Sequence, residues 1–366
     1  MEERRMEARK LPMSKQKNPF NISFGRRPDQ YISRTIQSQK IIDTFTLEPV
    51  TEQINILTGV RGSGKTITLS VIANELEQRK NWIVLRLNPL EKDLIGAAAS
   101  ELYYNHKVKF RFVRPSFSVN SFGIQASLNE DAPAKTSIIY FDELIRSLKK
   151  NQKILITIDE VTNTPQLKTF SSYFQMLVSK EYPIYLLMTG LYENVQSLQD
   201  NKELTFLYRA PKIFLEPLDR GAMSASYQSV FQINENEALE LAKLTKGYPF
   251  AFQALGYVYW NNRGKDFLQI ITEYDHLLSD AAYSKIWSEL SELDKTIVCQ
   301  MANKMLEENI DNLPVKSIRQ ACKMPANKFS VYRKRLIEKG VIASPSYGHL
   351  SFALPRFQNF VKNNIL

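Results

Sequence analysis

The chain has 366 residues, 43% of them hydrophobic, which excludes disorder of the whole chain and favours two or three domains over a single core. With 48 lysines and arginines against 38 acidic residues, the formal charge is +10. A basic protein attracts polyanions such as nucleic acid, acidic membrane surfaces or nucleotides, although charge alone does not distinguish these partners from general solubility.

Cysteine usage argues against a metal or redox centre. Cys299 and Cys322 are the only cysteines and form no closely spaced pair, which is typical of a protein in a reducing cytoplasm. The N-terminus lacks the apolar segment of a secretory signal, and no apolar run approaches the roughly 20 residues that span a bilayer. We therefore expect a cytoplasmic protein without a membrane partner.

The N-terminal segment 1–18 is charged and shows no hydrophobic periodicity. We expect a disordered basic tail, with a contact to nucleic acid as the less favoured alternative. From residue 19 to 217, strand-like apolar runs alternate with helical patterns, which is typical of a parallel sheet covered by helices. The sequence therefore predicts a three-layer α/β core over 19–217.

Five short runs are apolar on both faces, as the buried strands of a parallel sheet are. The predicted strands are 54–60, 82–88, 153–159, 183–189 and 212–218.

One segment breaks the alternation of strands and helices. Residues 107–128 show period-two alternation interrupted at Arg114 and Pro115, which predicts an inserted β-hairpin. The hairpin is either a contact for a partner or a decoration of the core, and the sequence leaves both open.

Two smaller units follow the core. Residues 218–288 are helical: Asn234 and Glu237 form a capping-box start, Gly247 ends that helix and Pro249 begins the next. Residues 289–366 show three helical patterns and then two short strands, which is the order of a winged helix-turn-helix. We expect a helical lid followed by a winged-helix domain.

The strongest motif is GVRGSGKT at residues 59–66, a complete Walker A P-loop between a strand and a helix. Glycines let the backbone amides curl around phosphates, and the helix N-terminus favours negative charge there. Lys65 is expected to reach the β- and γ-phosphates and Thr66 to ligate Mg²⁺. The predicted nucleotide-binding residues of the loop are Gly59, Arg61, Gly62, Ser63, Gly64, Lys65, Thr66 and Ile67.

An acidic partner for the P-loop follows the third predicted strand. Asp159 is expected to bind Mg²⁺ through water, and Glu160 to polarise the attacking water. Asp142 and Glu143 also follow an apolar run, but an amphipathic pattern continues through them. We interpret that pair as surface carboxylates of a helix.

Three further residues stand at strand ends. Thr189 is a candidate for orienting the lytic water or sensing the γ-phosphate. Asn88 either hydrogen-bonds Glu160 or is an ordinary loop residue. Arg209 precedes the last core strand, where it serves either as an arginine finger towards a neighbouring subunit's nucleotide or in a surface ion pair.

Taken together, GVRGSGKT, ILITIDE, LLMTG and KGYPFAFQALG resemble the AAA+/STAND ATPases, in particular those related to the archaeal origin-recognition initiators. The segment 18–34 is similar to the adenine-side segment of that group, and the end of the chain to its winged helix. The resemblance covers nearly the whole chain from Asn18 onward and implies ATP, rather than GTP, as the nucleotide.

By this resemblance, Tyr31 and Ile32 would flank the adenine base, and Gly247, Tyr248 and Pro249 would lie over it from the lid. The sequence departs from the family in two places. Ser33-Arg34 stands where Gly-Arg is usual, and the lid helix has no arginine at the usual sensor position. Both departures favour a slowly hydrolysing ATPase that works as a switch.

The third helix of the expected winged helix is rich in basic and hydroxyl side chains, which suits a helix that lies in the major groove of duplex DNA. The candidate DNA-contacting residues are Lys328, Ser330, Arg333, Lys334 and Arg335. The function this predicts is an ATPase switch that contacts DNA. The alternatives are a STAND-like signalling ATPase, whose winged helix binds protein or a second copy of the chain, and a degenerate ATP binder.

Overall fold

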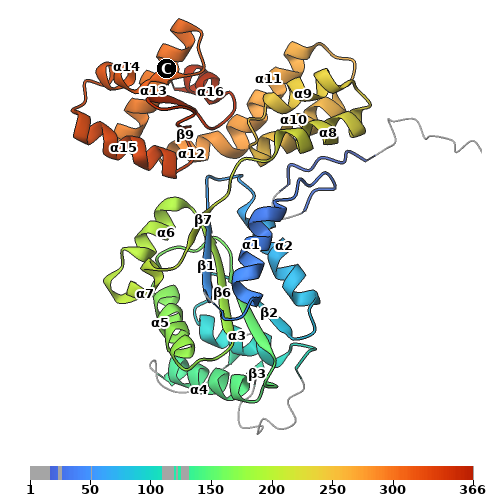
Figure 1. The fold of residues 1–366 in the computed structure, drawn as a ribbon, viewed down its shortest axis with the longest axis vertical. Helices are drawn as coiled ribbons and strands as arrows, with labels where there is room; N and C mark the ends of the chain where they lie inside the picture. The colour runs from blue at the N-terminus through green and yellow to red at the C-terminus, as the bar shows by residue number, and fades with distance from the viewer. Residues whose placement is uncertain are drawn as a thin grey trace, which may run out of the picture.

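The computed structural model describes residues 17–23, 27–50, 52–108, 119–120, 123–124 and 132–365. Of the predicted N-terminal tail, all but residues 17 and 18 lies outside the described residues. The chain forms two bodies, a lower α/β core and an upper helical body, with the connection after β7 running between them (Figure 1).

The core is built on a five-stranded parallel sheet with the order β2-β5-β6-β1-β7. Its strands are β1 (Ile54–Thr58), β2 (Trp82–Leu87), β5 (Lys153–Ile158), β6 (Ile184–Gly190) and β7 (Lys212–Phe214). All five predicted strands are confirmed, with differences at their ends. This sheet confirms the predicted three-layer α/β fold of P-loop ATPases.

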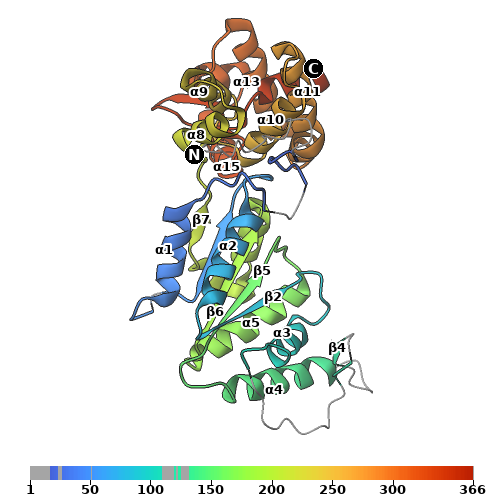
Figure 2. The ribbon, with the colours of Figure 1, turned by 90° about the vertical axis from the view of Figure 1, so that its right-hand side faces the viewer.

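Neighbouring residues of each strand point to opposite faces, so each face of the sheet has its own hydrophobic core. Leu57 of β1 packs with α1 (Thr35–Thr46) and α2 (Lys65–Gln78) on one face. Ile56 packs on the other face, which four further helices cover. Those helices are α3 (Leu94–Tyr103), α4 (Ala132–Arg146), α5 (Pro165–Ser179) and α6 (Tyr192–Gln199) (Figure 2).

The predicted inserted hairpin is present in part. The two-residue strands β3 (Val119–Asn120) and β4 (Gly123–Ile124) pair antiparallel, and residues 109–118, 121–122 and 125–128 of the predicted insertion lie outside the described residues. Asp142 and Glu143 lie on α4, as predicted. Asp142 pairs with Arg146 one turn later, and Glu143 is exposed.

The upper body begins with helices α8 to α12. They are α8 (Arg220–Phe231), α9 (Glu235–Lys243), α10 (Pro249–Asn261), α11 (Phe267–Leu278) and α12 (Ser284–Ser288), with a π-helical turn η3 (Ser279–Tyr283) before the last. Asn234 caps α9 by accepting the N–H of Glu237, and Pro249 occupies the first turn of α10, both as predicted.

The C-terminal domain follows directly. Its elements are α13 (Glu292–Glu308), β8 (Leu313–Pro314), α14 (Val315–Ala321), α15 (Ala326–Glu338), β9 (Ile342–Ala343), β10 (His349–Phe352) and α16 (Phe357–Asn364). The strands form a small antiparallel sheet in the order β8-β10-β9. Three helices and a β-hairpin therefore occur in the predicted order.

One hydrophobic cluster runs through both parts of the upper body, from Phe20 and Leu218 to Val361. Arg356 before α16 also forms a two-pronged ion pair with Asp275 of α11, with 2.6 Å between Nη2 and Oδ2. The lid and the C-terminal domain are thus packed as a single body, the lid–C-terminal body. Among the described residues, no helix is long and apolar enough to cross a membrane.

Candidate functional site

The P-loop connects the end of β1 to the start of α2, and all three of its glycines have positive φ. Gly62 has φ of 76° and Gly64 has φ of 86°, a conformation that glycine adopts without steric cost. A Cβ on Gly62 would lie 2.2 Å from the hydroxyl of Tyr248. Both the turn and the closeness of the lid therefore require glycine at position 62.

Lys65 begins α2, and its ammonium lies inside the loop. Nζ donates hydrogen bonds to the carbonyl oxygens of Gly59 at 3.0 Å and Val60 at 3.1 Å. Burial lowers the pKa of Lys65 to about 8, although the nearby carboxylates of Glu160 and Asp159 oppose the shift. The loop therefore holds a cation that is costly to keep charged without an anionic partner.

Asp159 lies just beyond β5 and is held from two sides. The Thr66 hydroxyl donates to Oδ2 at 2.7 Å, and the Thr189 hydroxyl donates a short hydrogen bond to Oδ1. The backbone N–H of Glu160 donates to the same Thr189 hydroxyl at 3.0 Å. Residues of α2, of β6 and of the loop after β5 thus meet at one carboxylate.

Thr189 is fully buried behind Asp159, and the cavity of the site does not reach it. Its placement suits a residue that positions the acidic pair better than one that touches a lytic water. Glu160 is exposed and has φ of 53°, a left-handed conformation that is unusual outside glycine. Strain of this kind is typical of functional sites, because the surrounding structure must maintain it.

A cavity of about 410 Å³ lies between the core and the lid. Its wall is lined from the core side by Gly62, Gly64, Lys65, Thr66, Ile67, Asp159 and Glu160, and from the N-terminal segment by Tyr31, Ile32 and Arg34. From the lid, Pro249, Phe250, Phe252 and Gln253 contribute. One end is charged and the other largely apolar, as a nucleotide requires for its phosphates and its base.

Three buried polar atoms in or beside this cavity have no hydrogen-bond partner within the described part of the chain. They are Tyr31 Oη, Arg61 Nε and Ser63 Oγ. A buried polar atom without a hydrogen-bond partner destabilises the folded state, so these three atoms are consistent with a polar ligand that binds here. Arg27 stacks on the ring of Tyr31 at 4.6 Å and so covers one of its faces.

The lid contacts the P-loop directly. The Tyr248 hydroxyl donates to the carbonyl oxygen of Arg61 at 2.5 Å, and the N–H of Phe250 donates to the carbonyl oxygen of Gly62 at 3.3 Å. Pro249 lines the cavity as the resemblance implied, whereas Tyr248 binds the loop and does not line it. Burial raises the pKa of Tyr248, so this phenol stays protonated and a donor.

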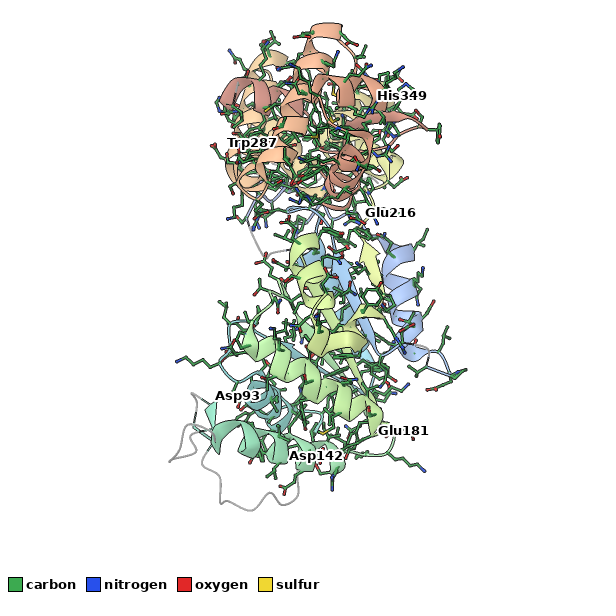
Figure 3. All side chains as sticks on the ribbon, turned by 90° about the vertical axis from the view of Figure 1, so that its left-hand side faces the viewer. Asp93, Asp142, Glu181, Glu216, Trp287 and His349 are labelled. Atoms are coloured by element: carbon green, nitrogen blue, oxygen red, sulfur yellow. The ribbon has the colours of Figure 1, made fainter. Side chains whose placement is uncertain are left out.

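Arg34 lines the cavity, although the sequence analysis did not include it among the site residues. Its guanidinium donates to the carbonyl oxygen of Glu216 from Nε at 3.2 Å and from Nη2 at 2.8 Å. Glu216 lies where the two bodies meet (Figure 3). The Gly-Arg position of the resembling family was the signal that could have found Arg34.

Asn88 and Arg209 lie elsewhere than at the cavity. The Asn88 side-chain oxygen accepts the N–H of Leu90 at 3.0 Å, so Asn88 forms a local turn, which agrees with the alternative of an ordinary loop residue and not with a bond to Glu160. Short polar side chains at strand ends commonly bond the backbone two residues on. Arg209 is exposed at the end of α7 (Thr205–Tyr208), and no ion pair found among the described residues includes it.

The five candidate DNA-contacting residues divide into two groups on α15. Lys328 and Ser330 are exposed near its start. Arg335 is bound internally: Nη2 lies 2.6 Å from Oδ2 of Asp294 and 2.5 Å from the Ser291 hydroxyl. Lys334 lies 3.8 Å from Glu338 on the same helix, and Arg333 is partly buried.

A family model described as a domain of unknown function (DUF8462) matches residues 280–361, which covers the end of the lid and most of the C-terminal domain. No curated protein sequence matches the chain. Among solved structures, the Aeropyrum pernix ORC2 protein in its ADPNP–ADP complexes is similar over 93% of this chain and 96% of that chain, with a TM-score of 0.60 and 11% identity. The chain has the fold of an archaeal origin-recognition ATPase.

Two more distant structures complete the comparison. The Aeropyrum pernix ORC1 protein in complex with DNA covers 93% of this chain and 95% of that chain, with a TM-score of 0.46 and 12% identity. A STAND protein with a tetratricopeptide repeat sensor from Pyrococcus horikoshii covers 92% of this chain and 43% of that chain, with a TM-score of 0.40 and 14% identity. The similarity to the ORC2 structure, with its TM-score of 0.60, confirms at the level of fold the resemblance seen in the sequence.

Proposed function

We propose that the chain is an ATP-binding, slowly ATP-hydrolysing switch, and that its C-terminal domain is a winged helix that contacts duplex DNA. The observation that carries the proposed ATPase activity is that the hydroxyls of Thr66 and Thr189 both bond Asp159, next to Glu160 and beside a 410 Å³ cavity. The similar ORC2 protein was solved with ADPNP and ADP, which supports an adenine nucleotide as the ligand.

The residues present fit Mg²⁺-ATP. Bound Mg²⁺ would neutralise charge on the phosphates and so favour their transfer to water. Thr66 and Asp159 would hold the ion, and the P-loop amides and Lys65 would hold the phosphates. No group of three or more His, Cys or acidic side chains able to hold a metal occurs in the described residues. A Mg²⁺ ion here therefore needs phosphate oxygens, as is usual for this ion.

Glu160 is the candidate general base of the proposed reaction. It is exposed, its backbone is fixed through Thr189, and it follows the carboxylate of the proposed metal site. Turnover is expected to be slow because α10 contains no arginine at the lid position that would stabilise transition-state charge. Among the described residues, the arginines that line the cavity are Arg34, from the N-terminal segment, and Arg61, from the P-loop.

Support for DNA binding comes from exposed basic side chains on the C-terminal domain. Lys316, Lys323 and Lys328 are exposed on or next to α14 and α15, and Tyr347 is fully exposed in the turn between β9 and β10. Lysines supply phosphate contacts, and a helix of this kind can lie in the major groove.

The variant Glu160→Gln tests the proposal that the chain hydrolyses ATP. We expect retained ATP affinity and turnover about 100-fold lower, because the base is lost while the phosphate-binding residues remain. The matched control is Glu143→Gln, which removes an exposed carboxylate of α4 and is expected to leave turnover unchanged. Unaltered turnover in Glu160→Gln would show that Glu160 is not the base.

Anisotropy of labelled duplex DNA, measured with ATP, with ADP and across a salt series, tests the DNA half. We expect affinity that depends on the nucleotide and falls steeply with salt, because phosphate contacts release counterions. Salt-insensitive or absent binding in every nucleotide state would reject this half.

A second candidate function is STAND-like assembly, in which the C-terminal domain binds protein. Exposed Arg209 and the absence of arginine from α10 favour it, because a second copy could supply the missing cation. ATP-dependent self-association without DNA affinity, reduced in Arg209→Ala, would support this alternative. A monomer in every nucleotide state would reject it.

A further inference from the structure

The two bodies of the molecule also meet away from the nucleotide cavity, where α6 of the core faces α15 of the C-terminal domain. A cleft of about 840 Å³ lies between these helices. Glu193, Gln196 and Asp200 line it from α6, and Val331, Lys334 and Arg335 line it from α15. An acidic helix of the core thus faces the basic helix to which DNA contact is assigned.

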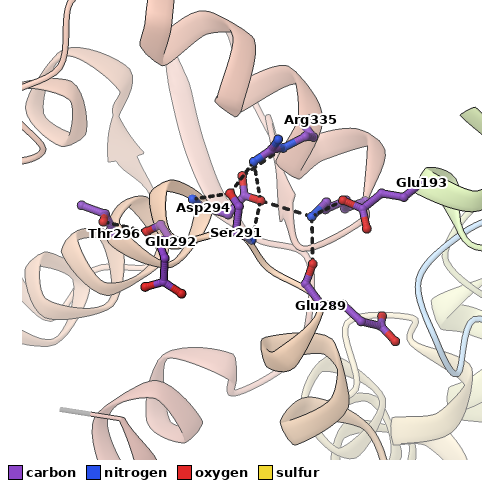
Figure 4. Close-up of polar contacts among 8 residues, drawn as sticks. Glu193, Glu289, Ser291, Glu292, Asp294, Thr296 and Arg335 are labelled. Atoms are coloured by element: carbon purple, nitrogen blue, oxygen red, sulfur yellow. Dashed lines mark hydrogen bonds and ion pairs between the residues drawn. The ribbon is translucent and has the colours of Figure 1, made fainter. Parts of the chain in front are cut away.

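Lys339, directly after α15, connects the bodies at one edge of this cleft. Its ammonium lies 2.7 Å from Oε1 of Glu193 on α6 and 3.2 Å from Oδ2 of Asp294 on α13. It also donates to the carbonyl oxygen of Glu289 at 3.3 Å (Figure 4). Lys339 is 9% exposed and Asp294 is fully buried, so the cation is held inside a charged network.

A second contact joins the same helices. The Tyr192 hydroxyl at the start of α6 donates to Oε2 of Glu338 at 2.6 Å. The ring of Tyr192 stacks on Phe214 of β7, which fixes the position of the hydroxyl. We call Tyr192, Glu193, Glu338 and Lys339 the α6–α15 latch.

Two basic side chains of α15 lie beside the latch. Lys334 and Arg335 line a cleft whose opposite wall is the core. Asp294, which pairs with Lys339, also binds Arg335 through its guanidinium. An α-helix enters the major groove of DNA only if the space in front of it can admit the duplex, and α6 lies across the cleft from this part of α15.

The latch is connected to the P-loop through two contacts. Nη2 of Arg61, which lines the nucleotide cavity, lies 3.6 Å from a carboxylate oxygen of Glu289, whose carbonyl oxygen accepts from Lys339. Gly340, the residue after Lys339, packs against Val60, so that an added Cβ would lie 3.3 Å from the Val60 side chain. Phosphates in the loop would compete with Glu289 for Arg61.

We propose that the α6–α15 latch holds the winged helix against the acidic face of the core and masks part of its DNA-binding surface. Nucleotide at the P-loop weakens the latch through Arg61 and Val60. This inference rests on the proposed function for the identity of the ligand, duplex DNA, but the contact between α6 and α15 is independent of that identity.

The test uses the double variant Tyr192→Phe/Glu193→Gln in the full-length chain. Both substitutions keep the side-chain shape and lie on the core, so Asp294 and Lys339 keep their buried pairing. Phenylalanine also keeps the stacking on Phe214. The matched control is Glu181→Gln, which removes one negative charge at the far end of the core (Figure 3).

The first readout is the distance between the bodies, measured between spin labels at Gln175→Cys and Tyr347→Cys after Cys299→Ala and Cys322→Ala remove the native thiols. Both label sites are exposed. We expect one short population in the wild type without nucleotide and a longer population in the double variant. An unchanged distribution in the double variant would overturn the latch, whatever the DNA result.

The second readout is affinity for a labelled duplex without nucleotide. We expect the double variant to bind about tenfold more tightly than the wild type and Glu181→Gln, because apparent affinity scales with the fraction of molecules that are open. Longer distances with unchanged DNA affinity would reject the masking. If no protein binds DNA in any nucleotide state, the proposed function fails, and the distances alone decide whether the latch exists.

Discussion

The hydroxyl of Tyr248 in the lid donates a 2.5 Å hydrogen bond to the carbonyl oxygen of Arg61 in the P-loop. The backbone N–H of Phe250 reinforces it by donating to the next carbonyl oxygen along the chain, that of Gly62, at 3.3 Å. Because the lid and the C-terminal domain share one hydrophobic cluster, the conformation of the P-loop, residues 59–64, is coupled to the whole lid–C-terminal body.

Replacing this tyrosine tests the coupling. Tyr248→Phe should lower the free energy of unfolding by about 1 kcal/mol, because a buried hydrogen bond is lost and a carbonyl loses its partner. It should also reduce the stabilisation that ATP confers in thermal unfolding, since lid and loop are less firmly joined. The control Tyr257→Phe removes a hydroxyl from the same helix, α10, and should leave the ATP-dependent shift unchanged. Equal shifts in both variants would contradict the coupling.

Glycine substitutions separate backbone strain from the lid contact. Gly62→Ala and Gly264→Ala both place alanine at positive φ, 76° and 86°, and each should cost about 1 kcal/mol of stability for that reason. Only at Gly62 does the new Cβ clash, with the Tyr248 hydroxyl; nothing lies within 4 Å at Gly264. ATP binding, measured by calorimetry, should therefore weaken more than tenfold, by ~1.4 kcal/mol or more, in Gly62→Ala alone. Similar ATP affinity in both variants would exclude the clash.

Local features of the sequence predicted the sheet and the acidic motif correctly because both depend on short-range patterns. The apolar run ending in Asp159 defines a buried strand wherever its neighbours lie, and the loop before Lys65 needs its glycines for its own geometry. Partners distant in sequence were not accessible in this way. Arg335 was assigned to DNA because its helix is basic, but Asp294, 41 residues earlier, binds it. For Asn88 the sequence left a bond to Glu160 and an ordinary loop role open, and the structure shows a bond to the nearby backbone N–H of Leu90.

Thr189 is predicted to act through Asp159 and Glu160. Thr189→Val removes the hydroxyl that both residues use while keeping the side-chain shape, so turnover should fall about 10- to 100-fold, as for other residues that orient metal ligands. ATP affinity should fall less, because the P-loop remains intact. The control Thr157→Val removes another buried hydroxyl of the same sheet, one that bonds the carbonyl of Leu85. Kinetics titrated with Mg²⁺ should show weaker Mg²⁺ affinity, and so a need for more Mg²⁺, only in Thr189→Val; equal losses in the two variants would indicate a general packing defect.

The lowered pKa of Lys65 gives the site a pH signature. Burial places this pKa at about 8, below its ordinary value of 10.5, so the folded chain binds fewer protons than the unfolded chain between these values. Burial of the charged Lys65 therefore lowers the free energy of unfolding by its full amount below pH 8, and this loss disappears as the pH rises towards 10.5. Phosphates favour the charged ammonium, so ATP binding should take up a proton in this window.

At pH 9 the uptake should reach about 0.9 proton per ATP, and affinity should be about tenfold weaker than at pH 7, given a pKa near 8. Phosphate groups titrate near pH ~6 and do not contribute there. Calorimetry in two buffers of different ionisation enthalpy measures the uptake directly. Residual binding by Lys65→Arg should take up no proton, because a guanidinium stays charged. Absence of proton uptake by the wild type at pH 9 would show that the ammonium is already charged in the free loop.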